Sequence, residues 1–109
     1  MTEPEFDKFG YPIEATLQVI RNWDYRGQAH RGLLDFVRGA WNRDYGNIEV
    51  FPPYPSLDDN ERWVFVTGGW SGNEMLIDAL MENMMFYSQR WYQSTRGGRY
   101  EFHIWKPPA

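Results

Sequence analysis

The feature that most constrains the fold is a pair of alternating segments on either side of Gly97-Gly98. The stretch RWYQSTRGGRYEFHIW runs from Arg90 to Trp105, and its alternation is typical of half-buried β-strands. Adjacent glycines can both adopt positive φ, which a two-residue type I′ turn requires. We therefore predict a β-hairpin, and with it an antiparallel sheet, in this part of the chain.

A two-residue turn fixes the register of the hairpin and so assigns each side chain to a face. The expected core face contains Trp91, Gln93, Thr95, Tyr100, Phe102 and Ile104. The other face contains Arg90, Tyr92, Ser94, Glu101, His103 and Trp105. Tyr, Trp and Arg are enriched at interaction hot spots, so this second face is a candidate protein-binding surface. The alternative is that a helix covers it and that His103 is an ordinary histidine of the sheet.

Helical periodicity predicts two helices ahead of the sheet. One, over about 12–22, repeats Leu17, Ile20 and Trp23 at helical spacing. The other, over about 28–42, carries an apolar stripe made of Leu33, Leu34, Val37, Ala40 and Trp41. Residues 1–10 are acidic and have no such pattern, so we expect a loose leader there.

Two further strands are predicted between these helices and the hairpin. Residues 47–51 alternate and are followed by Pro52 and Pro53, which cannot donate to a strand ladder. A second strand over 63–67 is expected to pair back antiparallel. The acidic run Asp58-Asp59-Asn60-Glu61 lacks the alternating oxygen ligands and central glycine of a calcium loop, so we interpret it as a turn and predict no metal site.

The stretch VFVTGGWSGNE, residues 64–74, has the form of a turn from a strand into a helix. Ser71 and Glu74 match the S-x-x-E capping box, which predicts that the helix begins here with Ser71 as its N-cap. The helix is expected to end near residues 86–90, with a buried stripe of Leu76, Ile77, Leu80 and Met84.

Three active interpretations of the same loop are open, and their candidate residues are Gly69, Trp70, Ser71 and Asn73. A phosphate-binding loop needs Lys and then Ser/Thr after its last glycine, but Asn73-Glu74 stands there. A nucleophile elbow, G-x-S-x-G, fails only at its closing position, and His30 or His103 would have to act as its base. An anion at the helix start would meet the carboxylate of Glu74.

Composition narrows the class of protein. A chain of 109 residues fits one domain, and the absence of cysteine excludes disulfides and thiolate chemistry and suits a cytoplasmic location. The pI of about 5.1 argues against a nucleic-acid partner, and no segment is typical of a signal peptide or a membrane anchor. Charge is unevenly placed, because residues 90–109 carry four Lys/Arg against one Asp/Glu while the rest is acidic.

The motifs TGGWSGNE and STRGGRYEF, with the chain from GYP at Gly10–Pro12 onward, resemble a family of small uncharacterised proteins encoded by tailed phages, prophages and their bacterial hosts. The resemblance implies a genomic setting and transfers no catalytic or ligand residue. Small acidic phage proteins without a catalytic constellation often act by binding, including as inhibitors of host defence.

We therefore predict a single α+β domain with element order α-α-β-β-α-β-β and a mostly antiparallel sheet of about four strands. The leading function is that of a non-enzymatic binding protein of phage type with a protein partner, for example an anti-CRISPR-like inhibitor, and with no cofactor. Homo-oligomerisation stays open. The first alternative is a small-ligand or nucleotide-binding protein using the loop from Gly68 to Asn73, and the second is a hydrolase using Ser71.

Overall fold

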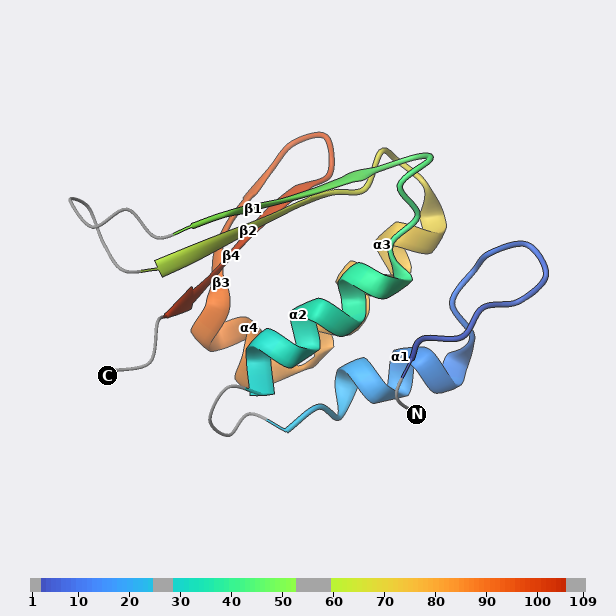
Figure 1. Ribbon diagram of the computed structural model, residues 1–109, viewed down its shortest axis with the longest axis horizontal. Helices are drawn as coiled ribbons and strands as arrows, with labels where there is room; N and C mark the ends of the chain where they lie inside the picture. Colours follow the sequence, from blue (N-terminus) through green and yellow to red (C-terminus); the bar gives the residue numbers. More distant parts are fainter. Residues whose placement is uncertain (1–2, 25–28, 53–59, 106–109) are drawn as a thin grey trace.

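A four-stranded antiparallel sheet with helices against one face forms the described part of the chain (Figure 1). The computed structural model describes residues 3–24, 29–52 and 60–105, with only the backbone at positions 29, 60 and 105. The helices are α1 (Glu14–Arg21), α2 (Ala29–Ala40), α3 (Ser71–Glu82) and α4 (Met84–Arg90). The strands are β1 (Asn47–Phe51), β2 (Asn60–Val66), β3 (Trp91–Thr95) and β4 (Arg99–Trp105). The predicted α+β class and element order are confirmed, with one helix broken in two.

The sheet has the strand order β1-β2-β4-β3, so β2 and β4 form its centre. In their antiparallel register Trp63 lies opposite Phe102, and Arg62 lies opposite His103. Direct partners share a face of the sheet, and neighbouring residues of a strand point to opposite faces. One face, which we call the inner face, therefore carries Trp63 and Phe102 toward the helices, and the outer face carries Arg62 and His103.

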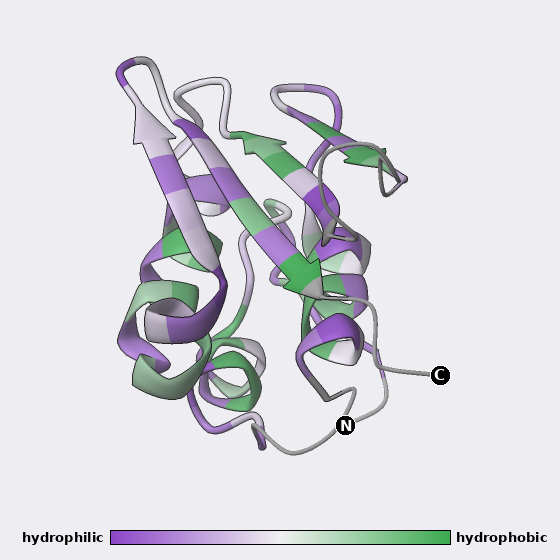
Figure 2. Cartoon of the chain, turned by 90° about the vertical axis from the view of Figure 1, so that its left-hand side faces the viewer, coloured by the Kyte–Doolittle hydropathy of each residue, from purple (hydrophilic) through white to green (hydrophobic). Residues whose placement is uncertain are grey.

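The core lies between the inner face and the helices. Strand β4 alternates apolar and polar residues, as the hydropathy colouring shows (Figure 2), and β2 is apolar from Trp63 to Val66. Their apolar residues meet the predicted stripe of α2, which is buried at every position: Leu33, Leu34, Val37, Ala40 and Trp41. Leu17 and Ile20 of α1 are buried as predicted, and α3 contributes Leu76, Ile77, Ala79 and Leu80.

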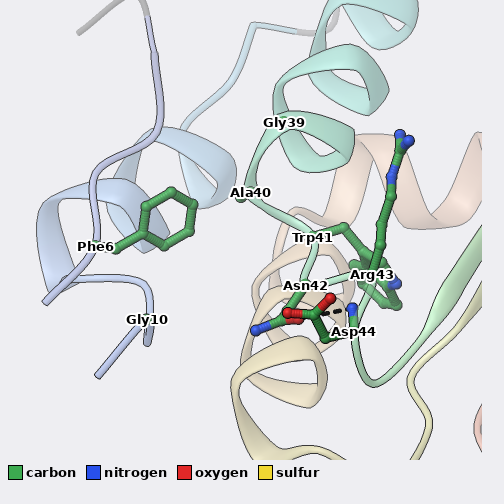
Figure 3. Close-up of a pocket in the computed structure, with 8 residues that line it drawn as sticks. All are labelled: Phe6, Gly10, Gly39, Ala40, Trp41, Asn42, Arg43 and Asp44. Carbon is green, nitrogen blue, oxygen red and sulfur yellow. Dashed lines mark hydrogen bonds between the residues drawn. The ribbon is translucent and has the colours of Figure 1, made fainter. Parts of the chain in front are cut away.

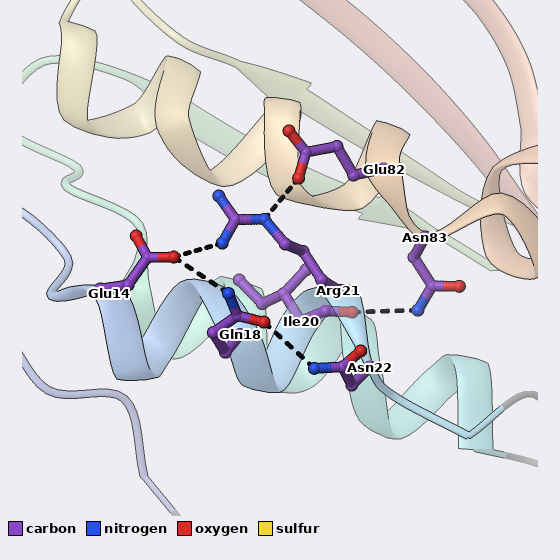
Figure 4. A network of polar contacts seen from close by, with 7 residues as sticks. All are labelled: Glu14, Gln18, Ile20, Arg21, Asn22, Glu82 and Asn83. Carbon is purple, nitrogen blue, oxygen red and sulfur yellow. Dashed lines mark hydrogen bonds and ion pairs between the residues drawn. The ribbon is translucent and has the colours of Figure 1, made fainter.

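The helix that follows the glycine loop is broken at Asn83, whereas the sequence predicts one continuous helix to residues 86–90. The buried Asn83 side chain accepts a hydrogen bond from the backbone N–H of Phe86, which starts α4. Its amide also donates to the carbonyl oxygen of Ile20 at 2.9 Å (Figure 4) and to that of Trp23 at 3.3 Å. Because of this break, Met84 does not lie in the buried stripe as predicted, and its side chain is 69% exposed.

The acidic leader is ordered from residue 3 onward, which differs from the loose segment that its composition predicts. Glu5 exchanges backbone hydrogen bonds with the Thr16 hydroxyl of α1 in both directions, each at 2.9 Å. The Asp7 carboxylate accepts from the backbone N–H groups of Phe9 and Tyr11. Carboxylates favour such turns because they satisfy nearby backbone donors. Helix α1 then begins at Glu14, slightly later than predicted.

The C-terminal hairpin forms, but its turn has three residues, 96–98, because Thr95 lies opposite Arg99. Gly97 and Gly98 both have positive φ as predicted, yet the two-residue turn is wrong. The Gly98 carbonyl accepts a 3.0 Å hydrogen bond from the backbone N–H of Thr67, which ties this glycine to the end of β2. The longer turn shifts the register of β3 by one residue relative to the prediction. A β-bulge between Trp91 and Gln93 then brings Trp91 opposite Phe102, on the same face of the sheet.

The predicted core face of the hairpin is correct on β4 and wrong on β3. Phe102 and Ile104 are buried, and Tyr100 is half-buried. All five residues of β3 are exposed, including the predicted core residues Trp91, Gln93 and Thr95. Strand β3 lies at the edge of the sheet, so it has a neighbouring strand on one side only.

Asn83→Ala is expected to lower the free energy of unfolding by about 2–4 kcal/mol, because it removes three hydrogen bonds to the backbone groups of Ile20, Trp23 and Phe86, two of them buried. The control is Asn22→Ala, which removes an exposed asparagine at the end of α1 and should change stability by less than about 0.5 kcal/mol. Urea denaturation followed by tryptophan fluorescence measures both. Equal midpoints for the two variants would contradict this role of Asn83.

Candidate functional site

Four planar side chains, one from each strand, form a row across the outer face. From β1 to β3 they are Phe51, Arg62, His103 and Tyr92, and we call this set the outer row. Phe51 lies opposite Arg62 in the register, and the guanidinium carbon of Arg62 lies 5.1 Å from the centre of the Phe51 ring. His103 lies opposite Arg62, and the ring of Tyr92 stacks on His103 with centroids 4.0 Å apart and planes 10° apart.

Tyr92 is the member of the outer row most accessible from solvent. It is 56% exposed, whereas Phe51 and Arg62 are half-buried and the side chain of His103 is 12% exposed. The helices α1 to α4 all lie on the other side of the sheet (Figure 1). Sequence reasoning correctly places Tyr92 and His103 on one face, because the bulge in β3 restores that pairing. It missed Phe51 and Arg62, which join this face only through the pairing of β1 with β2 and of β2 with β4.

Glu101 lies beside the outer row and is only 7% exposed. One carboxylate oxygen lies 2.6 Å from Nε2 of His103, and the other accepts from Arg99 at 3.4 Å. These two side chains therefore cover the carboxylate and satisfy both of its oxygens. Its contact with Nε2 fixes the orientation of the His103 ring that stacks on Tyr92.

Arg90 and Trp105 do not extend this site as predicted. Arg90 ends α4, and its Nε atom donates to Nδ1 of His30 at 2.9 Å. His30 is 1% exposed and meets Phe86 edge to face, so this contact belongs to the helix side of the sheet. The register shift and the end of α4 separate Arg90 from Tyr92. The side chain of Trp105 lies outside the described residues, although its backbone continues β4 opposite residue 60.

The glycine loop is a turn from β2 into α3, and the predicted capping box is wrong. Helix α3 begins at Ser71, so its N-cap is Trp70, which has no side-chain cap. The backbone N–H of Glu74 donates to the Trp70 carbonyl, and the Ser71 hydroxyl lies 3.3 Å from the hydroxyl of Tyr11. The helix starts one residue earlier than the motif predicts, so Ser71 is already helical and cannot serve as the cap.

The other candidate residues of the loop contact the protein itself. Asn73 is fully buried, and its amide group exchanges hydrogen bonds with the backbone N–H and carbonyl of Asn42 at 2.9 and 3.1 Å. Its Nδ2 atom also donates to the Thr67 carbonyl. The Trp70 ring packs against Tyr11 on one side and Tyr45 on the other, with centroid distances of 4.9 and 5.4 Å. This loop therefore joins three segments of the chain.

The described contacts give Ser71 no base. His30 contacts Arg90 and Phe86, and His103 contacts Glu101 and Tyr92. Within residues 3–24, 29–52 and 60–105, no group of three His, Asp or Glu residues is arranged to hold a metal ion. Of the acidic run at 58–61, Asp58 and Asp59 lie outside the described residues, while Glu61 is part of β2 and pairs with Arg31 at 2.5 Å.

An open pocket of about 340 Å³ lies between the N-terminal segment and the end of α2 (Figure 3). Phe6 and Gly10 form one side, and the stretch from Gly39 to Asp44 forms the other. The Asn42 side chain accepts from the backbone N–H of Asp44, so part of its polar lining is satisfied internally. No sequence pattern indicated this pocket, because it depends on the ordered leader.

No protein-family model matches the chain, and no curated protein or solved structure is significantly similar to it. Among the described residues, no helix is both long and apolar enough to span a membrane. The case for the site therefore depends on its geometry.

Gly68 and Gly69 give a direct test of the loop. Both have positive φ, but a Cβ at Gly68 would lie 1.6 Å from the Tyr45 carbonyl oxygen, whereas a Cβ at Gly69 would meet open space. Gly69→Ala is expected to cost about 1 kcal/mol of stability and Gly68→Ala more than about 2 kcal/mol. Ser71→Ala should stay within about 0.5 kcal/mol, because this serine caps nothing. Chemical denaturation of the three variants measures these effects, and an equal loss at both glycines would refute the close approach.

The buried His30 predicts a dependence of stability on pH. Burial, and then the charge of Arg90, lower the pKa of His30 below its ordinary value of 6.5. The unfolded chain thus takes up a proton more readily, so the stabilisation is complete above pH 6.5 and is lost as the pH falls below it. His30→Asn keeps an acceptor for Arg90 but does not titrate. The stability of the wild type should fall more steeply than that of His30→Asn between pH 7.5 and pH 5, and parallel curves would contradict this account.

Proposed function

We propose that the protein is a non-enzymatic binding protein that recognises a protein partner through the outer face of its sheet. The observation that carries this proposal is the outer row, in which four planar side chains stand on a face that no described helix covers. Tyr92 is its most exposed member and stacks on His103. Tyr and Arg side chains are enriched among residues that dominate binding energies.

The contacts within the outer row support a binding role because they order the side chains before a partner arrives. Glu101 holds His103, and His103 supports Tyr92. The Phe51 ring supports the guanidinium of Arg62. Fixing a flexible side chain on association costs about 0.5–1.5 kcal/mol, and a side chain that is already ordered avoids much of that cost. The row is thus suited to binding at little entropic cost.

For the partner, we propose a protein of a bacterial host or of a phage, with inhibition of a host defence system as one example. The support for this finer proposal is the resemblance of TGGWSGNE and STRGGRYEF to phage-encoded proteins. The contacts of Asn73 and Trp70 within the fold favour this reading over ligand binding at the glycine loop. The contacts of Ser71, His30 and His103 likewise favour it over hydrolysis.

Tyr92→Ala tests the proposal with a closely matched control, Tyr45→Ala. Both tyrosines are similarly exposed, at 56% and 59%, and each stacks on one aromatic ring. Immobilised wild type and both variants are incubated with bacterial lysate, captured proteins are identified by mass spectrometry, and the affinity of the purified partner is then measured. Tyr92→Ala should lose about 2 kcal/mol of binding free energy or more, while Tyr45→Ala keeps the wild-type affinity.

Unfolding midpoints accompany the binding data, because a folded Tyr92→Ala protein is needed for the comparison. If all three proteins capture the same partner with the same affinity, the outer row is not the binding surface. If a partner is lost only with Tyr45→Ala, the surface lies at Trp70 instead.

A further inference from the structure

Strand β3 forms an edge of the sheet that lacks charged or proline residues. Its sequence, WYQST, has no charge, and all five residues are exposed. The opposite edge, β1, has Glu49 at its centre and Pro52 after its end. Edge strands usually carry charges or prolines that prevent pairing with other chains, although the bulge in β3 is itself one such device. By this criterion β3 is the more open of the two edges.

The chain around β3 is positively charged. No Asp or Glu occurs between Glu82 and Glu101, whereas Arg90, Arg96 and Arg99 lie in that interval. Arg99 pairs with the buried Glu101 at 3.4 Å and Arg90 contacts His30, so the exposed Arg96, together with the partly compensated Arg99, supplies the positive charge at this edge. An acidic partner segment would be attracted to this edge, and a basic one repelled. Two copies meeting edge to edge would bring like charges together.

The two sides of β3 differ in chemistry. Toward the helices, Trp91 stacks on Tyr87 of α4 with centroids 5.6 Å apart, and its indole N–H donates to the Ser94 hydroxyl at 2.8 Å. Helix α4 lies beneath this edge (Figure 2), and its Met84 and Met85 are 69% and 42% exposed. This side is therefore mainly aromatic, with the Ser94 hydroxyl as its polar group.

On the outer side, the bulge places both Tyr92 and Gln93 on the outer face. Thr95 follows them on this face, beside its register partner Arg99. An incoming strand would thus find an aromatic ring and a guanidinium group on this side.

We propose that β3 binds an extended, acidic segment of the partner protein as a fifth strand of the sheet. Alternate side chains of that segment point to opposite faces. Its apolar side chains meet Trp91 and α4, and its carboxylates meet Arg99 on the outer side and Arg96 at the turn. The inference rests on the proposed function in one respect, that the partner is a protein. It adds the place of binding and the chemistry of the bound segment.

The probes are labelled peptides of about ten residues, a length that one added strand needs. One alternates Val with Glu, one alternates Val with Lys, and one has the Val/Glu composition with two central prolines. A fourth probe is a single-stranded oligo-dT of similar length. Fluorescence anisotropy gives the affinities for the whole protein, and amide hydrogen exchange followed by NMR locates the contact.

The Val/Glu peptide should bind at least about 10-fold more tightly than the Val/Lys and proline peptides, and it should slow amide exchange in β3 but not in β1. Binding of the Val/Glu peptide without protection of β3 overturns the proposal. So does equal binding of the acidic and basic peptides, or no binding of either. Preferred binding of oligo-dT at the outer row would assign the face to nucleic acid and overturn it as well.

Thr95→Glu and Thr95→Lys form a matched pair at this edge. Thr95 is exposed, and either replacement keeps β3 uncharged except at this one position. Thr95→Glu should weaken the Val/Glu peptide about 10-fold, and Thr95→Lys should leave its affinity unchanged or raise it. An equal loss in both variants would point to disturbed packing and would count against the proposal. Hydrogen exchange of the free variants confirms that the hairpin is intact.

Failure of this inference is distinguishable from failure of the proposed function. A partner whose capture depends on Tyr92, together with no effect of Thr95→Glu, leaves the outer face as the binding surface and rejects strand addition. Strand addition without any dependence on Tyr92 leaves the edge site standing and rejects the outer row.

Discussion

The pairing of β2 with β4 is the interaction on which the rest of the structure depends. This central ladder runs from residues 60 to 66 and from 99 to 105, and it decides which side chains share a face. On the inner face it joins Trp63 to Phe102 beneath the helices. On the outer face the same register joins Arg62 to His103. A slip of one residue would exchange these two sets, so the core and the candidate site are specified together.

The sequence predicts the elements whose signals are local. Alternation locates β1 and the hairpin, and helical periodicity identifies the buried stripe of α2 because both patterns report burial directly. It fails where a distant segment decides the outcome. The break at Asn83 depends on carbonyl groups of α1, and the turn at 96–98 depends on a hydrogen bond from Thr67. A serine three residues before a glutamate suggests a cap, but the helix starts one residue earlier.

The residues of the candidate site also divide into those that a local sequence pattern places and those that only long-range strand pairing reveals. Tyr92 and His103 can be placed on one face from the hairpin alone, and the bulge preserves that relation despite the wrong turn. Phe51 and Arg62 join them only through strand pairing across the whole sheet. The sequence pattern assigns Arg90 to the site wrongly. Its alternation with Tyr92 predicts a shared face, but Arg90 is the last residue of α4 and its side chain contacts His30. A pattern read within one hairpin cannot reveal where the preceding helix ends.

The bonds of Asn83 also bear on how the chain folds. Its side chain connects positions about sixty residues apart, linking the end of α1 to the start of α4. Closing a loop of this size costs chain entropy, so the link is stable only when both ends are held in place by the rest of the fold. The hydrogen bond that starts α4 thus comes from a side chain whose position is also set by α1. The N-terminal third of the chain and the C-terminal hairpin consequently belong to one cooperative unit, and neither is suited to independent expression as a fragment.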